Sequence, residues 1–421
     1  MQTTAGVFHL AREVIDRCRR LASFSEDPKS IRRTFLSPPM HKVHQEITGW
    51  LEPLGVTPRV DAVGNLRAVL SGSEPSAPRL LLGSHLDTVP NAGPFDGILG
   101  VVMGVALLQE CVARKFPYAI ELIGFSEEEG VRFGTPFIGS RALVGRIDDD
   151  LLARQDERGT SVRQAIKDFG LRPEEIPQAA LSDHVGGYLE FHIEQGPVLE
   201  KLGLPLAAVE SIAGQTRMDF IFNGRTNHAG TTPMDLRHDA VACAAEWVGC
   251  VELVARSTPG LVATVGSFEA KPGATNVIAG EARLTLDVRH GSDPRRTQAV
   301  DDLIRQSKEV AARRGLSVRS FTRMNQAAVN MDPELTNQVE MAISKSGCKP
   351  HRMVSGAGHD AMILAERVPA TMIFLRTPGG VSHDPAESVA VDDVAKAIEC
   401  GLHLLDQLAS SKTLRARTCR A

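Results

Sequence analysis

The sequence is poor in aromatic residues, which make up 5% of its 421 residues, with only two Trp and two Tyr. Proteins that bind single-stranded nucleic acid use such rings to stack bases. The net charge of −4 also lacks the positive bias of nucleic-acid-binding domains. The composition therefore argues against a nucleic-acid partner.

The seven cysteines are odd in number, scattered along the chain, and form no C-x-x-C pair. This pattern argues against a disulfide framework and against a zinc site built from thiolates. Residues 1–21 lack the apolar core of a signal peptide, and the longest apolar stretch, Leu99–Leu108, is too short to span a bilayer. We therefore expect a soluble, cytoplasmic protein with no membrane partner.

Four short apolar runs predict buried strands. They are Leu80–Leu82, Ile120–Phe125, Tyr188–His192 and Thr371–Leu375. Continuous apolar runs of this length are typical of strands in a parallel or mixed sheet covered by helices. Polar residues follow each run almost at once, and α/β sheets bind ligands outside the carboxyl ends of their strands. The pattern predicts an α/β fold whose larger domain has a central mixed sheet flanked by helices.

Residues 213–327 show a different pattern, that of a small α+β domain. In Glu281–Arg289, apolar and polar residues alternate with the period of a half-buried strand. The predicted elements, in chain order, are strand Arg217–Asn223, helix His238–Arg256, strands Leu261–Ala270 and Glu281–Arg289, a helix around Val300–Ala311, and strand Leu316–Phe321. This βαββαβ order is the split βαβ plan of a two-layer domain. We expect it to be inserted into the larger domain, which comprises residues 1–212 and 328–421.

Five segments place ionisable residues directly after strand-like runs: Gly83–Val89, Gly93–Gly100, Ser126–Gly130, Phe191–Gly196 and Gly379–Pro385. Histidines and carboxylates without thiolates suit a hydrolytic site for zinc, manganese or cobalt. Two such ions, about 3.5–4 Å apart, need a bridging carboxylate. Asp96 stands on a glycine-rich turn and suits that position. Asp87 is expected to accept the other ring N–H of His85.

The acidic run Glu127–Glu129 is predicted not to be a buried structural feature, since three unpaired buried carboxylates are costly. One of them can bind metal while its neighbour holds the attacking water. Taken alone, His85 or His192 would more often be a structural histidine, and an acidic run a solvated surface. Their joint occurrence at predicted strand ends favours a metal site.

Together these segments resemble the M20 metallopeptidase superfamily, and within it the amidase (hydantoinase/carbamoylase) branch. The resemblance covers nearly the whole chain and rests on Gly83–Val89, Phe95–Gly97, Glu128–Gly130, His192–Gly196 and Ser382-His383. The branch holds allantoate amidohydrolases, N-carbamoyl-L-amino-acid hydrolases, β-ureidopropionases and ureidoglycolate amidohydrolases. Peptidases of the superfamily usually have a carboxylate where His192 stands.

The resemblance implies two divalent metal ions per subunit, with manganese favoured over zinc and cobalt. It implies that His85, Asp96 and His192 hold one ion, and that Asp96, Glu129 and His383 hold the other. It implies Glu128 as the general base, although Glu127 stays open as an alternative. Asp87 is placed with the catalytic residues.

The resemblance also implies that the inserted domain is a lid and dimerisation domain. His228, in the segment Asn227–Pro233, would reach into the active site of the partner in a homodimer and stabilise the developing oxyanion. The substrate-binding residues would be Gln215, Arg217, His228, Asn276, Arg289 and the backbone of Gly358. Arg289 is chemically apt, because its planar guanidinium binds a carboxylate at two points.

Segments outside the metal residues, such as Thr34–Pro38 and Gly130–Phe133, most resemble allantoate amidohydrolases. The expected reaction is hydrolysis of the ureido C–N bond of allantoate to ureidoglycine, ammonia and carbon dioxide. Hydrolysis of an N-carbamoyl-L-amino acid, ureidoglycolate or β-ureidopropionate is the alternative. An aminoacylase or dipeptidase is disfavoured by His192, and a non-catalytic binding protein by the complete set of ligands.

Overall fold

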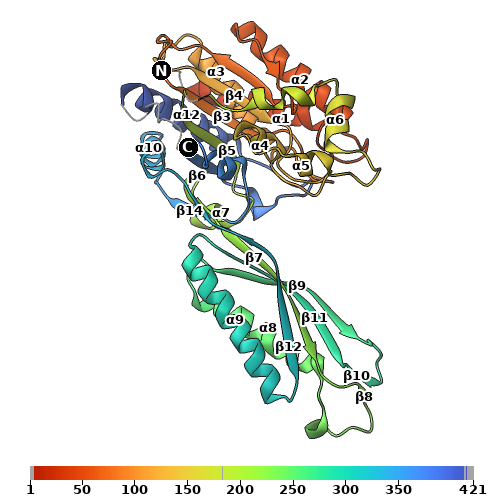
Figure 1. The fold of residues 1–421 in the computed structure, drawn as a ribbon. Coiled ribbons are helices and arrows are strands. Elements are labelled where there is room, and N and C mark those ends of the chain that lie inside the picture. The colour runs from red at the N-terminus through yellow and green to blue at the C-terminus, as the bar shows by residue number, and fades with distance from the viewer. Residues whose placement is uncertain (1–3, 183, 412–413, 415–421) are drawn as a thin grey trace. The chain divides into compact units, whose positions relative to one another are not determined.

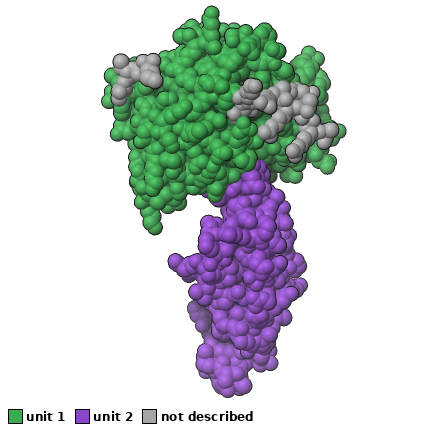
Figure 2. All heavy atoms as spheres, turned by 90° about the vertical axis from the view of Figure 1, so that its left-hand side faces the viewer, with its two compact units in different colours: residues 1–210, 331–353, 359–421 green, residues 211–330, 354–358 purple. Residues whose placement is uncertain are grey.

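The computed structural model describes residues 4–182, 184–411 and 414, which form two compact units (Figures 1 and 2). Unit 1 comprises Met1–Glu210, Met331–Met353 and His359–Ala421, and unit 2 comprises Ser211–Asn330 and Val354–Gly358. The sequence interpretation assigned residues 354–358 to the larger domain. The hydrogen bond from Ala213 N–H to the Ser355 carbonyl shows why this segment belongs with unit 2.

The larger sheet has nine strands in the order β1-β2-β4-β3-β5-β15-β6-β13, with β14 also paired to β6. The strands are β1 (Arg59–Val60), β2 (Leu66–Leu70), β3 (Arg79–His85), β4 (Ile120–Phe125), β5 (Val185–Ile193), β6 (Leu206–Ile212), β13 (Val329–Asn330), β14 (Arg352–Ser355) and β15 (Ala370–Leu375). The four predicted core strands lie within β3, β4, β5 and β15, which confirms the mixed α/β sheet.

The four central strands, in the order β4-β3-β5-β15, run parallel to one another, and β2 and β6 pair with them antiparallel on either side. Nearly every residue in the four central strands is buried, as expected for a sheet covered on both faces. Leu80 and Leu82 of β3 face one apolar core, and the period of two turns Leu81 to the other face. The registers align His85 with Phe125 and Leu375 with Ile193, so the carboxyl ends meet at one edge of the sheet.

Five helices share the main apolar core: α1 (Thr4–Ala22), α2 (Pro38–Leu51), α3 (Ile98–Cys111), α10 (Pro333–Lys345) and α12 (Val391–Ser410). A second cluster joins α4 (Ile138–Leu143), α5 (Asp149–Ala153), α6 (Val162–Asp168) and the 3-10 helix η2 (Pro173–Ala179). The remaining short helices of unit 1 are α7 (Val198–Leu202), α11 (Asp360–Leu364), η1 (Glu52–Leu54) and η4 (Pro378–Gly380). Among the described helices, none is both long and apolar enough to cross a membrane.

Unit 2 is a four-stranded antiparallel sheet in the order β12-β7-β11-β9, with two helices on one face. Its elements are β7 (Gly214–Asn223), α8 (Ala240–Ser257), β9 (Val262–Lys271), β11 (Glu281–His290), α9 (Asp293–Arg313) and β12 (Ser317–Gln326), with the ribbon β8 (Asn227–His228) and β10 (Val277–Ile278) and the 3-10 helix η3 (Met234–Leu236). This order agrees with the predicted βαββαβ plan. Trp247 of α8 packs against Phe220 and Phe222, and its Nε1–H donates to the Leu303 carbonyl of α9 at 3.0 Å.

Alternation along β7 and β11 leaves the other face of this sheet open. The even-numbered residues from Thr216 to Phe222 are buried, and the odd-numbered residues between them are partly or fully exposed. Strand β11 repeats the pattern, with its odd-numbered residues on the open face. The open face is therefore polar and carries several of the predicted substrate residues.

Candidate metal centre

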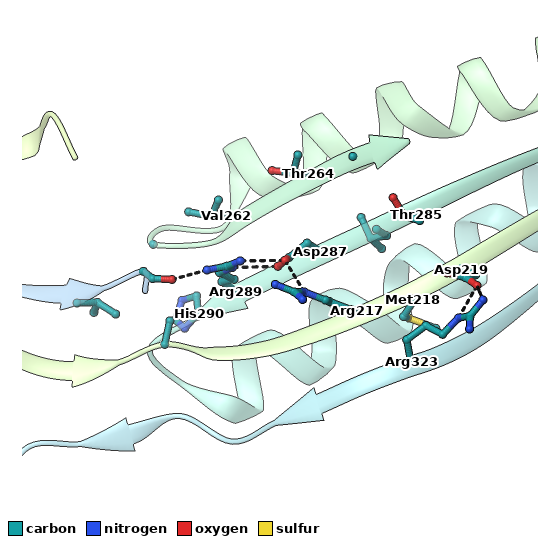
Figure 3. Close-up of a pocket in the computed structure, with 16 residues that line it drawn as sticks. Arg217, Met218, Asp219, Val262, Thr264, Thr285, Asp287, Arg289, His290 and Arg323 are labelled. Atoms are coloured by element: carbon teal, nitrogen blue, oxygen red, sulfur yellow. Dashed lines mark hydrogen bonds and ion pairs between the residues drawn. The ribbon is translucent and has the colours of Figure 1, made fainter. Parts of the chain in front are cut away.

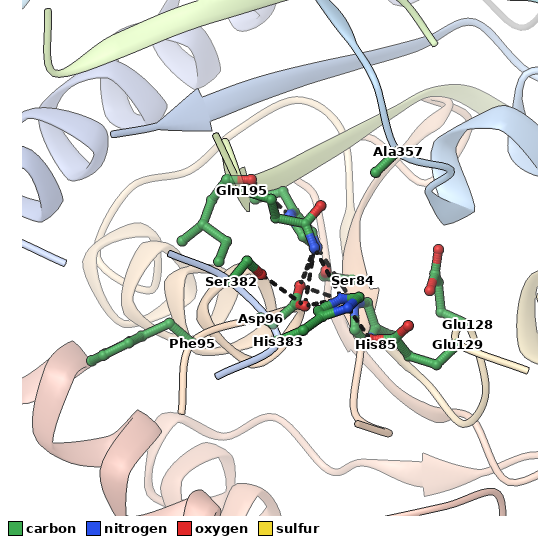
Figure 4. A network of polar contacts seen from close by, with 12 residues as sticks. Ser84, His85, Phe95, Asp96, Glu128, Glu129, Gln195, Ala357, Ser382 and His383 are labelled. Carbon is green, nitrogen blue, oxygen red and sulfur yellow. Dashed lines mark hydrogen bonds and ion pairs between the residues drawn. The ribbon is translucent and has the colours of Figure 1, made fainter. Parts of the chain in front are cut away.

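The carboxyl ends of the parallel strands of unit 1 bring the predicted ligands together (Figure 4). His85 ends β3, His192 lies near the end of β5, and Glu129 follows β4. His383 lies in the segment after β15, and Asp96 comes two residues before α3. The strand register brings His85, His192 and Glu129 to the same edge, and the segments after β3 and β15 bring Asp96 and His383 there.

Asp96 lies at the centre of the cluster and is 2% exposed. Its Oδ1 is 3.2 Å from Nε2 of His192 and 3.8 Å from Nε2 of His85. Its Oδ2 is 3.1 Å from Nε2 of His383, which in turn lies 3.7 Å from a carboxylate oxygen of Glu129. One carboxylate thus faces two sets of potential ligands, His85 with His192 and Glu129 with His383, each set within 4.8 Å.

The glycine before α3 allows this approach. Gly97 has a φ of 68°, and a Cβ atom there would lie 2.3 Å from the imidazole of His85. A larger residue would push the ring away from Asp96. The turn Phe95–Gly97 therefore depends on glycine both for its left-handed backbone and for the space it leaves.

The hydrogen bonds of the imidazoles indicate that a cation fits between them. Nδ1 of His85 lies 3.0 Å from the carbonyl oxygen of Asp87, and Nδ1 of His192 lies 2.9 Å from that of Ile193. A carbonyl can only accept, so each Nδ1 carries a hydrogen, and in the neutral ring Nε2 is a bare acceptor. These two Nε2 atoms are 3.4 Å apart and both face Asp96. Two lone pairs and a carboxylate at this separation suit a divalent ion.

The pKa shifts of the site also favour a bound cation. Burial raises the pKa of Glu129 to about 7, and the neighbouring carboxylate of Asp96 adds to that rise. Burial also raises the pKa of Glu128 well above its usual range; His85 opposes this effect, and Glu129 reinforces it. Burial lowers the pKa of His85, but Asp87, Glu128 and Asp96 outweigh it, so the pKa lies well above its usual value. The cluster favours added positive charge, and its donors fit two divalent metal ions.

Asp87 holds the acidic loop in place. Its carboxylate accepts hydrogen bonds from the N–H of Glu128 at 2.9 Å and of Glu129 at 3.1 Å. The sequence interpretation gave this carboxylate to the ring of His85. The ring instead bonds the main-chain oxygen of Asp87, and the carboxylate lies 3.4 Å away. Asp87 therefore orients His85 through its backbone and the acidic loop through its side chain.

Glu127 is buried, contrary to the expectation for the acidic run. Its side chain is 0% exposed, and one oxygen accepts a hydrogen bond from Gly130 N–H at 2.5 Å. Burial, followed by Asp87, raises its pKa well above the usual range. A protonated carboxyl has no charge to desolvate, which is why this position tolerates burial. Its neighbour Glu128 belongs to a possible ligand group with His85 and Glu129.

Sequence reasoning missed two residues that contact the centre. Gln195 donates from Nε2 to both oxygens of Asp96, at 3.1 and 3.0 Å, and has a φ of 59°. Glu387 accepts hydrogen bonds from the N–H of Phe95 and Asp96 and from the hydroxyl of Ser382. Gln195 lies inside the motif His192–Gly196, but the sequence did not indicate that its side chain bonds Asp96. Glu387 had no local signal, because its partners at Phe95 and Asp96 are distant in the sequence.

A further buried group, formed by Glu190, His192 and His359, also has metal-ligand spacing. The oxygens of Glu190 already accept hydrogen bonds from Ser84 Oγ, Tyr188 OH and Ala361 N–H. These bonds make Glu190 a support for strand β5 rather than a free ligand.

The predicted substrate residues of unit 2 fall into two groups. Gln215, Arg217 and Arg289 lie at one end of the sheet, where Arg289 pairs with Gln215 across β11 and β7. His228 and Asn276 lie together at the β8–β10 ribbon, where Ala229 N–H donates to the Asn276 carbonyl at 2.9 Å. Gly358, the remaining predicted residue, is the last residue of the segment Val354–Gly358.

His228 is exposed, and its loop is well bonded. Gly230 N–H donates to Nδ1 of His228 at 3.0 Å, so in the neutral ring Nε2 carries the hydrogen. Arg237 donates to the carbonyls of Ala229 and Thr232 and holds the loop from the other side. The loop therefore presents His228 as a hydrogen-bond donor.

The sequence of residues 81–407 matches the profile of Peptidase family M20/M25/M40. A probable allantoate deiminase from Oryza sativa subsp. japonica is 36% identical over 446 aligned residues, which cover 94% of this chain and 88% of the relative. An N-carbamoyl-L-amino acid amidohydrolase from Geobacillus stearothermophilus is 38% identical over 371 residues, which cover 87% of this chain and 90% of the relative.

A solved structure shows the same fold. It is a hydantoinase/carbamoylase family amidase from Burkholderia ambifaria, with a TM-score of 0.89 and 32% sequence identity. The superposition covers 95% of this chain and 97% of that chain.

Proposed function

The chain belongs to Peptidase family M20/M25/M40, and we propose that it is a two-metal amidohydrolase that hydrolyses the ureido C–N bond of allantoate. The products would be ureidoglycine, ammonia and carbon dioxide. The observation that carries this proposal is the position of Asp96, whose two oxygens face two sets of buried ligands. The similarity to a probable allantoate deiminase over 94% of the chain supports the substrate.

In this proposal, His85, Asp96 and His192 hold one ion, and Asp96, Glu129 and His383 hold the other. The nitrogen and oxygen donors suit manganese, and also zinc and cobalt. Bound ions of this kind polarise a carbonyl oxygen and lower the pKa of water. His192 would bind through Nε2, because its Nδ1 carries the hydrogen that the Ile193 carbonyl accepts.

Glu128 moves the proton. Its carboxyl group is 8% exposed and stands in the ligand group with His85 and Glu129, while Asp87 fixes its backbone. The Glu128 carboxylate takes a proton from the attacking water and returns it to the leaving nitrogen as the C–N bond breaks. The carbamate released in this step decomposes to carbon dioxide and ammonia. Glu127 is a weaker candidate for the base, since one of its oxygens already accepts from Gly130 N–H.

In this proposal the carboxylate of the substrate is bound by Arg289, Gln215 and Arg217, with the backbone of Gly358 as a further contact. Asn276 lies beside His228 at the other end of the unit, so it would contact the substrate from the same chain as His228. Arg289 supplies the planar guanidinium that a carboxylate needs for two parallel hydrogen bonds. Three of these groups share one end of the sheet in unit 2, so they can act on one anionic group.

We propose that the enzyme works as a homodimer in which His228 acts on the site of the partner. The support comes from distances within unit 2. Arg289 is eight residues from Glu281 along β11, roughly 25 Å at the rise of an extended strand. His228 lies on the ribbon beyond the Glu281 end (Figure 1). One small substrate cannot contact both ends of one unit, so in this proposal His228 and Arg289 act on the same substrate from different chains. His228 would then donate to the developing oxyanion.

Hydrolysis of N-carbamoyl-L-amino acids is the second candidate. It is favoured by the 38% identity to an N-carbamoyl-L-amino acid amidohydrolase over 87% of the chain. Both reactions use the same ligands and the same proton transfer and differ in the group carried by the carbon beside the carboxylate. Ammonia release from allantoate, compared with loss of the carbamoyl group from N-carbamoyl amino acids, separates them.

A further inference from the structure

The open face of the sheet in unit 2 carries a pocket of about 710 Å³ (Figure 3). Arg217, Asp287 and Arg289 line one part of it, and Asp219 and Arg323 line another. The pocket is lined by residues of unit 2 alone. Its central feature is the carboxylate of Asp287, which no step of the proposed reaction uses.

Asp287 accepts hydrogen bonds from Gln215, Arg217 and Arg289, the three side chains at this end of the sheet that are proposed to bind the substrate carboxylate. Its Oδ1 accepts from Nε of Arg289 at 3.0 Å, and its Oδ2 accepts from Nη2 of Arg289 at 3.0 Å. Oδ2 also accepts from Nε of Arg217 at 3.1 Å and from Nε2 of Gln215. The carboxylate of Asp287 thus contacts the same side chains that are proposed to bind the carboxylate of the substrate.

The strand register explains this arrangement. Asp287 is paired with Arg217, and Arg289 with Gln215, across β11 and β7. Residues two apart on neighbouring strands share a face, so these four side chains meet on the open side of the sheet. The sequence Asp287-Val288-Arg289 therefore places an acid directly beside the carboxylate-binding arginine.

Asp287 is ionised in this setting. Burial raises its pKa, but the hydrogen bonds and charge of Arg289, together with Gln215 and Arg217, outweigh burial and lower it. The two arginines and one aspartate then leave the group with a net charge of about +1, since Gln215 is neutral. Without Asp287, the same group would carry about +2.

Arg289 retains donors for a ligand. A guanidinium has five N–H donors, and Arg289 uses two on Asp287 and one on the Gly356 carbonyl, at 2.7 Å. Two donors remain without a partner among the described residues, which is the number one carboxylate accepts in a bidentate pair. Asp287 and Gly356 together fix the plane of the guanidinium, so these two donors have a fixed direction.

We propose that Asp287 is a specificity-determining residue, which orients Arg289 and limits the carboxylate site to one net positive charge. This inference rests on the proposed function, since it concerns the carboxylate site of that reaction. The chain then selects ureido substrates with a single carboxylate. A second carboxylate finds no unpaired cation in the group and meets the negative charge of Asp287.

The test uses ligand pairs that differ by one charge at nearly constant shape. Succinate and succinamate serve as binding probes in isothermal titration calorimetry, and N-carbamoylaspartate and N-carbamoylasparagine serve as substrates. Asp287→Asn removes the charge, and Asp287→Glu keeps it. Asp219→Asn is the matched control, because Asp219 pairs with Arg323 at 2.6 Å on the same open face.

We expect Asp287→Asn to shift the ratio of the two dissociation constants toward succinate by about tenfold, the effect of one unit charge in a partly buried site. The ratio of kcat/KM should shift toward N-carbamoylaspartate to a similar extent. Asp287→Glu should retain the selectivity of the wild-type protein, and Asp219→Asn should leave both ratios within about twofold.

Three results would overturn the proposal: an unchanged ratio in Asp287→Asn, an equal shift in Asp219→Asn, or no binding of either probe to the wild-type protein. Failure of the proposed function looks different. In that case the wild-type protein hydrolyses none of the ureido compounds. The ratio of binding constants for succinate and succinamate is measured without turnover, so it still tests the role of Asp287 by itself.

Discussion

The carboxylate of Glu387 holds the backbone on which Asp96 stands. Its Oε1 accepts from Asp96 N–H at 3.0 Å and from Phe95 N–H at 2.8 Å, and its other oxygen accepts from Ser382 Oγ at 3.2 Å. Ser382 precedes His383, so one side chain joins the turn of the central carboxylate to the loop of the last histidine. Glu387 itself lies 4% exposed.

Replacing Glu387 by Ala should weaken metal binding by roughly 10–100-fold, as is usual when a partner that orients metal ligands is lost. The affinity can be measured by titrating the metal-free protein with manganese. Glu200→Ala is the control, because the exposed Glu200 also bonds a backbone N–H nearby, that of Gly379. Equal affinities for Glu387→Ala and wild type would show that the bonds of Glu387 are not needed.

The Glu128→Gln variant should keep its fold and its metal but lose about 10²–10⁴-fold in turnover, because an amide cannot take the proton from water. Metal content and kcat are the two readouts. Glu127→Gln is the control: an amide oxygen can still accept from Gly130 N–H, so turnover should remain close to that of wild type. A loss of turnover in Glu127→Gln, with near-normal turnover in Glu128→Gln, would move the base to Glu127.

The His228→Ala variant should bind metal normally and turn over slowly, since His228 lies outside the ligand groups. If the active site is shared between two chains, mixing this variant with His383→Ala restores activity. Random pairing makes half of the dimers mixed, each with one complete site, so about a quarter of the wild-type activity should return. No recovery from two variants that are both shown to exchange subunits would place His228 on the site of its own chain.

The free energy of unfolding should decrease as the pH is lowered, and His44 on α2 should contribute to this decrease. His44 is 6% exposed. Burial lowers its pKa to about 3, and the charges of His41 and Arg33 add to that effect. The unfolded chain therefore binds this proton at a higher pH than the folded chain does. As the pH falls from about 6.5 to 3, His44 lowers the free energy of unfolding by up to roughly 1.4 kcal/mol per pH unit. His44→Gln should flatten the fall in the midpoint of thermal unfolding over this range. The exposed His9→Gln should not, and identical curves for His44→Gln and wild type would refute the assignment.

The strands and their carboxyl ends could be predicted from the sequence because their signals are local. Leu80–Leu82 and Ile120–Phe125 are apolar throughout, and the polar residues that follow them stand where the strands end. Helix α3 was less evident. It is buried at every residue from Ile98 to Leu108, so it has no polar face to reveal a helical period.

The contacts of the site could not be predicted in the same way, since they join distant segments. Nothing near Glu387 indicates that it bonds the backbone of Asp96, and the acid at Asp287 looks like any polar residue of an alternating strand. Glu127 was expected to be incompatible with burial, because the sequence does not show that its carboxyl can be neutralised beside Asp87. Local patterns placed the elements, whereas these roles depend on the packing between them.

The central claim is tested most directly by measuring ammonia release with the manganese-loaded enzyme. Allantoate is compared with a panel of N-carbamoyl-L-amino acids, ureidoglycolate and β-ureidopropionate, with metal-free enzyme and Glu128→Gln as blanks. The account predicts metal-dependent turnover of allantoate with a kcat/KM above that of every other compound. Preference for an N-carbamoyl amino acid would keep the site and replace the substrate, and no metal-dependent hydrolysis of any ureido compound would contradict the account.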